Sequence, residues 1–357
     1  MIQKPKNTRV TGAVIAEHLG ITPATVSRAL AGNPRISTTM QKKVRDTARE
    51  LGYISNATAR TLVKGHSNTI GILSGGLHVE RVAMELIALD AELRKQGFLP
   101  LLLYTRSERE SIVEGAKKLI ERGVDGLVII GCTSGALDEL CYQSLTKLLP
   151  TVFVDTPLAG HHVNMIINDY MNAYREAADI LIRENRTHVH ALVKQNMDIA
   201  PPGLHDPRFD GIISILERMN CRNYLHLQSS PGPAVLHDLS GLRQEYINRI
   251  EHILKTDPKC DAIVCNDDDL ALCILGLLQE RQKRVPDDIA ILGFSNIQLG
   301  NLSTPQLSTI AHQPLLVAKK TIERLLELIT RPDSEPVKIY VPGKLVNRQT
   351  LHRTPNQ

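Results

Sequence analysis

The hydrophobic pattern at the start of the chain predicts two short helices joined by a tight turn. Apolar residues recur at helical spacing over 12–19 and again over 23–30. Gly20 stands where a helix commonly ends in a left-handed conformation. Pro23 follows Thr22, a pair typical of a helix start, because threonine can cap free N–H groups and proline has none at that position. A helix-turn-helix needs this arrangement, and an ordinary helical hairpin in a core is the alternative.

A third helix is expected directly after this pair, from Ser37 to about Leu51. Ser37 is a suitable cap, Val44 and Ala48 lie on its apolar stripe, and Gly52 ends it. Its other faces carry basic side chains, some of which could contact phosphates. These are Lys42, Lys43, Arg45 and Arg49.

From position 69 onward, short apolar runs alternate with helical stretches such as 79–96 and 108–122. The first set of runs is 69–73, 99–104, 126–130 and 151–154. The second set is 190–193, 224–227, 262–265 and 289–293. Nearly continuous apolar strands separated by helices indicate parallel sheets that are covered on both faces. Two sets imply two doubly wound lobes, with a ligand bound at the carboxyl ends of the strands in the cleft between them.

The charge distribution separates the head from the body. The chain has 357 residues and a net charge of +4, but residues 1–66 hold eleven Lys and Arg against three Asp and Glu. A basic head on a mildly acidic body suggests that the head meets a polyanion. We find no apolar run of the roughly 18 residues that a membrane span needs and no signal-peptide core, so we expect no membrane contact and a cytoplasmic protein.

The sequence offers no catalytic or metal-binding constellation. We find no GxSxG, HExxH, Walker A or GxGxxG motif at a strand-to-helix turn, so we expect no enzyme. The run 267–269 is three aspartates, which we interpret first as a helix N-terminus, then as ligand contact, and least as catalysis. The cysteines form no CxxC pair, and His188 and His190 lack a partner at metal-ligand spacing. We therefore expect free thiols, no metal and no cofactor.

The segment 24–30, which reads ATVSRAL, resembles the lactose/galactose repressor (LacI/GalR) family of transcription regulators. The resemblance extends over 10–33 and through a hinge-like stretch at 53–62. In that family the hinge becomes a short helix on operator DNA, and its leucine, matching Leu62, wedges into the minor groove. The alternative for Leu62 is an exposed linker residue or a core contact. The DNA-binding residues that we expect are Thr22, Pro23, Ala24, Thr25, Ser27, Arg28, Asn56, Ala59, Arg60 and Leu62.

The body resembles the same family at 121–126, 261–271, 307–314 and 346–348, so the resemblance covers about 8–350. It implies an α/β protein, with an all-α helix-turn-helix head and two doubly wound lobes of the periplasmic-binding-protein type. The expected domains are a head at 1–54, a hinge at 55–67, a body at 68–350 and a tail at 351–357. Within the body we expect lobe 1 at about 68–167 and 309–335, and lobe 2 at about 168–308 and 336–350.

Arg208 is the sharpest candidate for the ligand site, because 208–211 matches the family's RxxG segment, whose arginine binds the effector. A surface arginine at a helix start is the alternative. Where many sugar-responsive members carry an aspartate, this chain has Ser295. We therefore weigh an anionic effector, such as a sugar acid or sugar phosphate, or one with fewer hydroxyls, against a neutral sugar for which Asp267 or another acid supplies the missing acceptor. The full set of expected effector-binding residues is Arg208, Phe209, Asn266, Asp267, Phe294 and Ser295.

These observations predict a dimeric repressor of palindromic operator DNA whose affinity changes when a small metabolite binds between the lobes. A corepressor-dependent regulator is the same-class alternative, and a solute-binding protein is the alternative of a different class. Palindromic sites require a two-fold symmetric homodimer. We expect the dimer to use a broad apolar helix face formed by Val82, Met84, Leu86, Ile87 and Leu89.

Overall fold

The computed structural model divides into two compact units, Met1–Ser67 and Asn68–Gln357. The residues that the structure describes are 10–53, 65–75, 80–105, 109–131, 139–155, 162–196, 207–221, 224–230 and 239–352. Four expected hinge contacts with DNA lie outside the described residues. They are Asn56, Ala59, Arg60 and Leu62.

The described part of the first unit is a three-helix head, which consists of α1 (Gly12–Leu19), α2 (Pro23–Leu30) and α3 (Thr38–Glu50). All three helices were predicted from the sequence and are confirmed to within one residue. They enclose a small apolar core to which each helix contributes two buried side chains. These are Ile15, Ala16, Val26, Ala29, Val44 and Ala48.

Local capping chemistry explains where the helices of the head begin and end. The Thr22 hydroxyl accepts a hydrogen bond from the Thr25 N–H at 3.2 Å, and Pro23 occupies the first turn of α2. Gly20 ends α1 with φ +64°, a conformation in which a side chain would be strained. The Ser37 hydroxyl caps α3 by accepting from the Met40 N–H at 3.3 Å. The turn geometry is therefore encoded in the residues between the helices.

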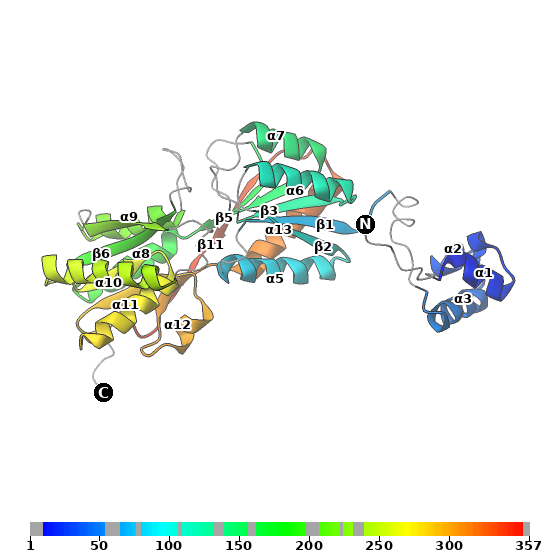
Figure 1. Cartoon of the computed structure of the whole chain (residues 1–357). Helices are drawn as coiled ribbons and strands as arrows, with labels where there is room; N and C mark the ends of the chain where they lie inside the picture. The colour runs from blue at the N-terminus through cyan, green and yellow to red at the C-terminus, as the bar shows by residue number, and fades with distance from the viewer. Residues whose placement is uncertain are drawn as a thin grey trace. The chain divides into compact units, whose positions relative to one another are not determined.

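The second unit contains two six-stranded sheets (Figure 1). The first sheet is wholly parallel, with the strand order β11-β5-β4-β3-β1-β2. Its strands are β1 (Thr69–Ser74), β2 (Leu99–Tyr104), β3 (Gly126–Ile130), β4 (Thr151–Val154), β5 (Met165–Asp169) and β11 (Lys338–Pro342). Its helices are α5 (Glu80–Lys95), α6 (Arg109–Glu121), α7 (Glu139–Leu148) and α13 (Pro314–Thr330). One apolar cluster lies between the sheet and α5 with α13, and another lies on the opposite face, under α6 and α7.

The second sheet has the order β12-β10-β9-β8-β6-β7 and is parallel except for β12. Its strands are β6 (Val189–Asn196), β7 (Leu225–Ser230), β8 (Ala262–Cys265), β9 (Ala290–Phe294), β10 (Ser308–Ala311) and β12 (Lys344–Val346). Its helices are α8 (Met171–Arg183), α9 (Pro207–Arg218), α10 (Leu239–Thr256), α11 (Asp268–Glu280) and the short α12 (Gln298–Leu302). The two doubly wound lobes predicted from the sequence are thus confirmed.

The expected lobe boundaries inside the body were wrong by two to seven residues. Strand β5 stays in the first sheet through Asp169, and β10 still belongs to the second sheet at 308–311. The largest error concerns β11 at 338–342, which we assigned to lobe 2 but which pairs with β5 in the first sheet. A short strand carries no signal for which sheet it joins, because that depends on a partner strand far away in the sequence.

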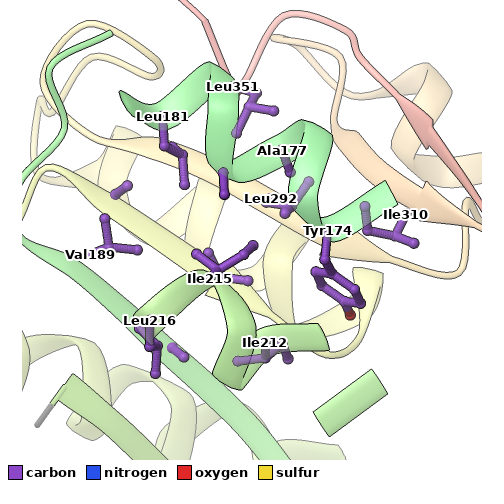
Figure 2. Close-up of a cluster of buried hydrophobic side chains, with 14 of the residues drawn as sticks. Tyr174, Ala177, Leu181, Val189, Ile212, Ile215, Leu216, Leu292, Ile310 and Leu351 are labelled. Carbon is purple, nitrogen blue, oxygen red and sulfur yellow. The ribbon is translucent and has the colours of Figure 1, made fainter. Parts of the chain in front are cut away.

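The glycine of the RxxG segment has a packing role. Figure 2 shows the core of the second lobe, where Tyr174 of α8 and Ile212 of α9 lie in the same apolar cluster. A Cβ atom placed on Gly211 would lie 1.9 Å from the Tyr174 ring. Glycine therefore allows α9 to pack closely on α8, and this packing fixes the start of α9, where Arg208 stands.

Candidate functional site

The side chains of α2 divide into a buried face and an exposed face. Val26 and Ala29 are buried in the core of the head. The opposite side exposes Thr22, Pro23, Ala24, Ser27 and Arg28, while Thr25 is half-buried. All six residues that we expect to contact DNA from this helix therefore lie on or beside its open face.

The adjoining helix α3 adds positive charge. Its four basic residues, Lys42, Lys43, Arg45 and Arg49, are all exposed. Arg45 donates a hydrogen bond to Gln41 at 3.2 Å, and Arg49 lies 3.9 Å from Asp46. The exposed hydrogen bond to Gln41 and the exposed ion pair with Asp46 are both weak, so the two guanidinium groups remain available to a phosphate backbone.

In the second unit, Arg208 lies over an aromatic pair. Its guanidinium carbon is 5.9 Å from the centre of the Phe294 ring, and Phe294 meets Tyr170 edge-on at 4.8 Å. Phe294 is fully buried at the end of β9, and Tyr170 immediately precedes α8. A cation held on an aromatic face suits the recognition of a planar anion or of hydroxyl groups.

Sequence reasoning missed an ionic group beside this pair. Arg81 Nη1 lies 2.6 Å from Asp155 Oδ2 and 3.2 Å from Glu85 Oε1, and the side chains are at most 14% exposed. Arg81 and Glu85 are one turn apart on α5, and Asp155 directly follows β4. The detectable signal was an i, i+4 charge pair near the start of a helix whose other inward positions are apolar. We call Arg81, Glu85, Asp155, Tyr170 and Arg208 the charged cluster.

Burial and mutual attraction shift the pKa values in the charged cluster. Burial raises the pKa of Glu85 to about 7, against the opposing attraction of Arg81, and the nearby Asp155 raises it further. Burial by itself would lower the pKa of Arg81, but Asp155 and Glu85 together raise it. Burial, followed by the Asp155 charge, raises the pKa of Tyr170 well above its usual value. At neutral pH both the phenol and the guanidinium therefore keep their protons.

His312, between β10 and α13, borders the charged cluster. Burial, together with the charge of Arg81, lowers its pKa to about 4, so the ring is neutral at pH 7. Its Nδ1 atom and the Tyr170 hydroxyl are buried and have no hydrogen-bond partner among the described residues. Buried polar atoms without partners are uncommon and suggest a position that a ligand can occupy.

The remaining expected effector residues divide between structural and open positions. Asp267 caps α11 by accepting from the N–H groups of Asp269 and Leu270, which confirms the structural interpretation of the aspartate run. Phe209, which we expected as an apolar wall of the ligand site, packs against the core of the second lobe. Asn266 is buried at the end of β8, and its N–H donates to the Leu192 carbonyl at 3.3 Å.

Ser295 stands where the strand β9 ends, with a strained backbone. Its φ of +111° and that of Asn296, +55°, lie in the left-handed region that favours glycine. The turn is held because the Ser295 N–H donates to the Ile310 carbonyl and Arg348 donates to the Asn296 side chain at 2.7 Å. Strain maintained in this way is typical of functional positions.

A histidine cluster lies apart from the charged cluster, on β6 and β7. His190 Nε2 is 3.0 Å from Asp257, His190 Nδ1 is 2.9 Å from His226 Nε2, and His188 also contacts Asp257. If Asp257 accepts from His190 Nε2–H, the neutral His190 Nδ1 accepts from His226. Burial, and then the charge of His190, lower the pKa of His226 to about 4. Among the described residues, no group of three or more acidic, histidine or cysteine side chains could hold a metal ion.

The lowered pKa of His226 makes the stability of the second lobe sensitive to acid. The unfolded chain takes up the proton near pH 6.5, but the folded chain does so only near pH 4. The contribution of neutral His226 to the free energy of unfolding is therefore fully present above pH 6.5 and is lost as the pH falls below that value. We expect the free energy of unfolding to fall by less than about 1 kcal/mol per pH unit between pH 6.5 and 5, because His226 is only half-buried and solvent screens part of the effect. Urea unfolding of a His226→Gln variant should show a smaller pH dependence than the wild type. A His162→Gln variant, changed at an exposed position of the first lobe, is the control, and equal slopes for all three proteins would contradict the assignment.

Comparisons with known proteins cover nearly the whole chain. Residues 15–56 match the family described as bacterial regulatory proteins, lacI family, and residues 178–351 match the periplasmic binding protein-like domain. The transcriptional regulator GntR of Pseudomonas aeruginosa is 27% identical over 97% of this chain and 98% of its own. The transcriptional repressor PurR of Aliivibrio salmonicida is also 27% identical, over 95% and 98%.

Solved structures share the fold. The lac repressor dimer bound to operator and the anti-inducer ONPF superposes with a TM-score of 0.79 at 22% identity, covering 97% of this chain and all of that one. The regulator CelR in complex with cellobiose gives 0.64 at 20% identity, covering 96% of this chain and all of that one. No helix in the described part of the chain is long and apolar enough to span a membrane.

Proposed function

The chain belongs to the lacI family of bacterial regulatory proteins, and from this premise we propose that it represses transcription from palindromic operators and releases them when an effector binds its charged cluster. The chain is a sequence-specific DNA-binding transcription regulator that responds to a small molecule. The observation that carries the proposed mechanism is the exposed face of α2, which includes Arg28. The start of this helix is fixed by its cap and by a first-turn proline, and its opposite face is buried in the core of the head. Such a face can enter a major groove while the core of the head stays intact.

The effector that fits the charged cluster best is a polyhydroxylated acid, such as a sugar acid or a sugar phosphate. Arg208 and Arg81 offer guanidinium groups to a carboxylate or phosphate. Asp155 and Glu85 can accept hydrogen bonds from hydroxyl groups. They can thereby take the role of the aspartate that many family members carry at the position of Ser295. Asp267, which we considered for that role, is engaged as a helix cap.

Two titrations test the proposed function. Fluorescence titration with genomic fragments should find a duplex that binds far more tightly than random DNA at physiological salt. Thermal unfolding with D-gluconate, D-glucose 6-phosphate and D-glucose should show stabilisation by the acids, about 2.7 kcal/mol at a hundred times the dissociation constant. The bound acid should then weaken operator binding.

Equal affinity for every fragment would contradict the proposed sequence-specific binding. Stabilisation by glucose alone would contradict the proposed class of effector. Tighter operator binding in the presence of the acid would indicate a corepressor.

The homodimer proposed for this chain has a candidate surface on the first lobe. The helix face expected from the sequence was only partly right, because Val82 and Leu89 are core residues. Met84 and Ile87 of α5 do face outward, 47% and 65% exposed. The edge strand β2 adds further exposed apolar side chains, which an unpaired edge does not usually display. These are Leu99, Leu101, Leu102 and Tyr104.

An Ile87→Glu substitution should convert the dimer to a monomer, because burying an unpaired carboxylate in an apolar interface is costly. Sedimentation at micromolar concentration should show the smaller species, and operator binding should weaken because one head can no longer assist the other. Ile182→Glu, on α8, changes a residue that is 44% exposed and should leave the dimer intact. If the Ile87 variant stays dimeric, the interface lies elsewhere.

A further inference from the structure

Two carboxyl groups of the charged cluster share one guanidinium nitrogen. Asp155 Oδ2 is 2.6 Å from Arg81 Nη1, whereas the two Glu85 oxygens are 3.2 and 3.3 Å from the same atom. Nη1 has two hydrogens, and the shorter contact belongs to Asp155. The Glu85 side chain is fully buried. Glu85 is therefore the weaker partner in a place where water cannot stabilise its charge.

Among the described residues, Arg81 is the only cation that forms an ion pair with Glu85. Asn168 of β5 lowers the pKa of Glu85, and the charge of Arg208 on α9 lowers the pKa of Arg81. Tyr170 and His312 are neutral at pH 7 for the reasons given above. Within the part of the chain that the structure describes, Arg81 therefore compensates both carboxylates by itself.

A like-charged pair in a buried site does not readily carry two full negative charges. The pKa of Glu85, about 7, means that the group is partly protonated at neutral pH before any ligand arrives. An anion that binds to Arg208 and Arg81 brings a third negative charge into the same buried region. Its arrival disfavours the ionised form of Glu85 further.

We propose that the anionic effector binds together with a proton, taken from solvent by the Glu85 carboxylate, so that the occupied site holds a neutral Glu85. This inference rests on the proposed function, because it requires the effector to be an anion. The neutral carboxyl gains an O–H, which can donate a hydrogen bond to the bound anion or to Asp155. The site thereby selects acids over neutral sugars. A neutral polyol would favour the ionised Glu85 carboxylate, which accepts hydrogen bonds from hydroxyl groups, and would therefore bind with release of a proton.

The sign of the pH dependence follows from this linkage. Below the pKa of free Glu85 the proton is already present and the affinity is independent of pH. Above it, each binding event must take up a proton, so the affinity falls by up to about tenfold per pH unit. D-gluconate is the probe, because its own carboxylate stays ionised over the whole range from pH 6 to 8.5.

Calorimetric titration of the full chain with D-gluconate at pH 7.5 tests the proposal. The measurement is repeated in phosphate, HEPES and Tris buffers, whose different ionisation enthalpies reveal the number of protons taken up. We expect roughly 0.7 proton per gluconate for the wild type, from a free pKa near 7. We expect none for Glu85→Gln, whose amide resembles the protonated acid and whose affinity should not vary with pH. Glu114→Gln, changed at an exposed position on α6, should behave as the wild type.

The outcomes separate this inference from the function on which it rests. Gluconate binding without proton uptake overturns the inference and leaves the anionic effector standing. Binding of D-glucose with proton release overturns both the inference and the effector class. Failure of every sugar acid and sugar phosphate to bind overturns the effector proposal and the inference together. If Glu85→Gln does not fold, the number of protons that the wild type takes up per gluconate still tests the inference.

Discussion

Replacing Arg208 with alanine is expected to abolish the response to the effector while leaving operator binding intact. The guanidinium group lies on the Phe294 ring at the start of α9, and Gly211 one turn later fixes that helix against α8. Removing the charge partner of an anion that becomes buried on binding costs about 2–5 kcal/mol, which corresponds to a loss of roughly thirtyfold or more in affinity. The measurement is the effector concentration that releases half of the operator-bound protein.

Two variants control for the Arg208 result. Arg208→Lys keeps the positive charge but loses the planar fork, so it should retain part of the response. Arg218→Ala, at the other end of α9, breaks an ion pair with Asp179 whose side chains are 43% and 47% exposed, and should respond as the wild type. A normal response in Arg208→Ala would place the effector site outside the charged cluster.

Replacing Arg28 with alanine is expected to remove much of the sequence specificity of DNA binding. Arg28 is exposed in the last turn of α2, beside the short side chains of Ala24 and Ser27, and nothing between them would block a base edge. An arginine that pairs with guanine contributes about 1–3 kcal/mol of discrimination. Fluorescence titration of the operator and of a variant with that base pair changed should show that the mutant no longer separates them.

Comparing Arg28→Ala with Arg49→Ala distinguishes an arginine that recognises a base from one that neutralises a phosphate. Arg49→Ala on α3 should weaken binding to all duplexes alike and reduce the salt dependence, with the ratio between operator and random DNA preserved. The hinge residue Leu62, which lies outside the described residues, remains a prediction from the family resemblance. If Arg28→Ala leaves the ratio unchanged, specificity comes from other residues of α2 or from the shape of the DNA.

The sequence by itself determined the head and the layered plan of the body. Thr22, Pro23 and Gly20 act through hydrogen bonds and backbone angles within four residues of themselves, so the ends of α1 and α2 could be predicted without any knowledge of the tertiary structure. The strands at 99–104, 126–130, 151–154 and 262–265 were predicted with their observed bounds. The last three of these are buried parallel strands, which are apolar along their whole length, and that pattern is visible in one dimension. The strand at 99–104 is apolar as well, but it is a largely exposed edge strand and not the buried strand that its pattern predicted.

Only the tertiary structure decided which charges meet. Arg208 and Ser295 could be proposed from the family resemblance, but Arg81, Glu85 and Asp155 could not, because a charge on a helix usually belongs to a solvated face. Asp155 is 74 residues from Arg81. Strand β11 likewise joins β5 across a separation that no local pattern records. Long-range pairing is set by the packing of whole lobes, and the pKa of Glu85 depends on the burial and the neighbouring charges that this packing creates.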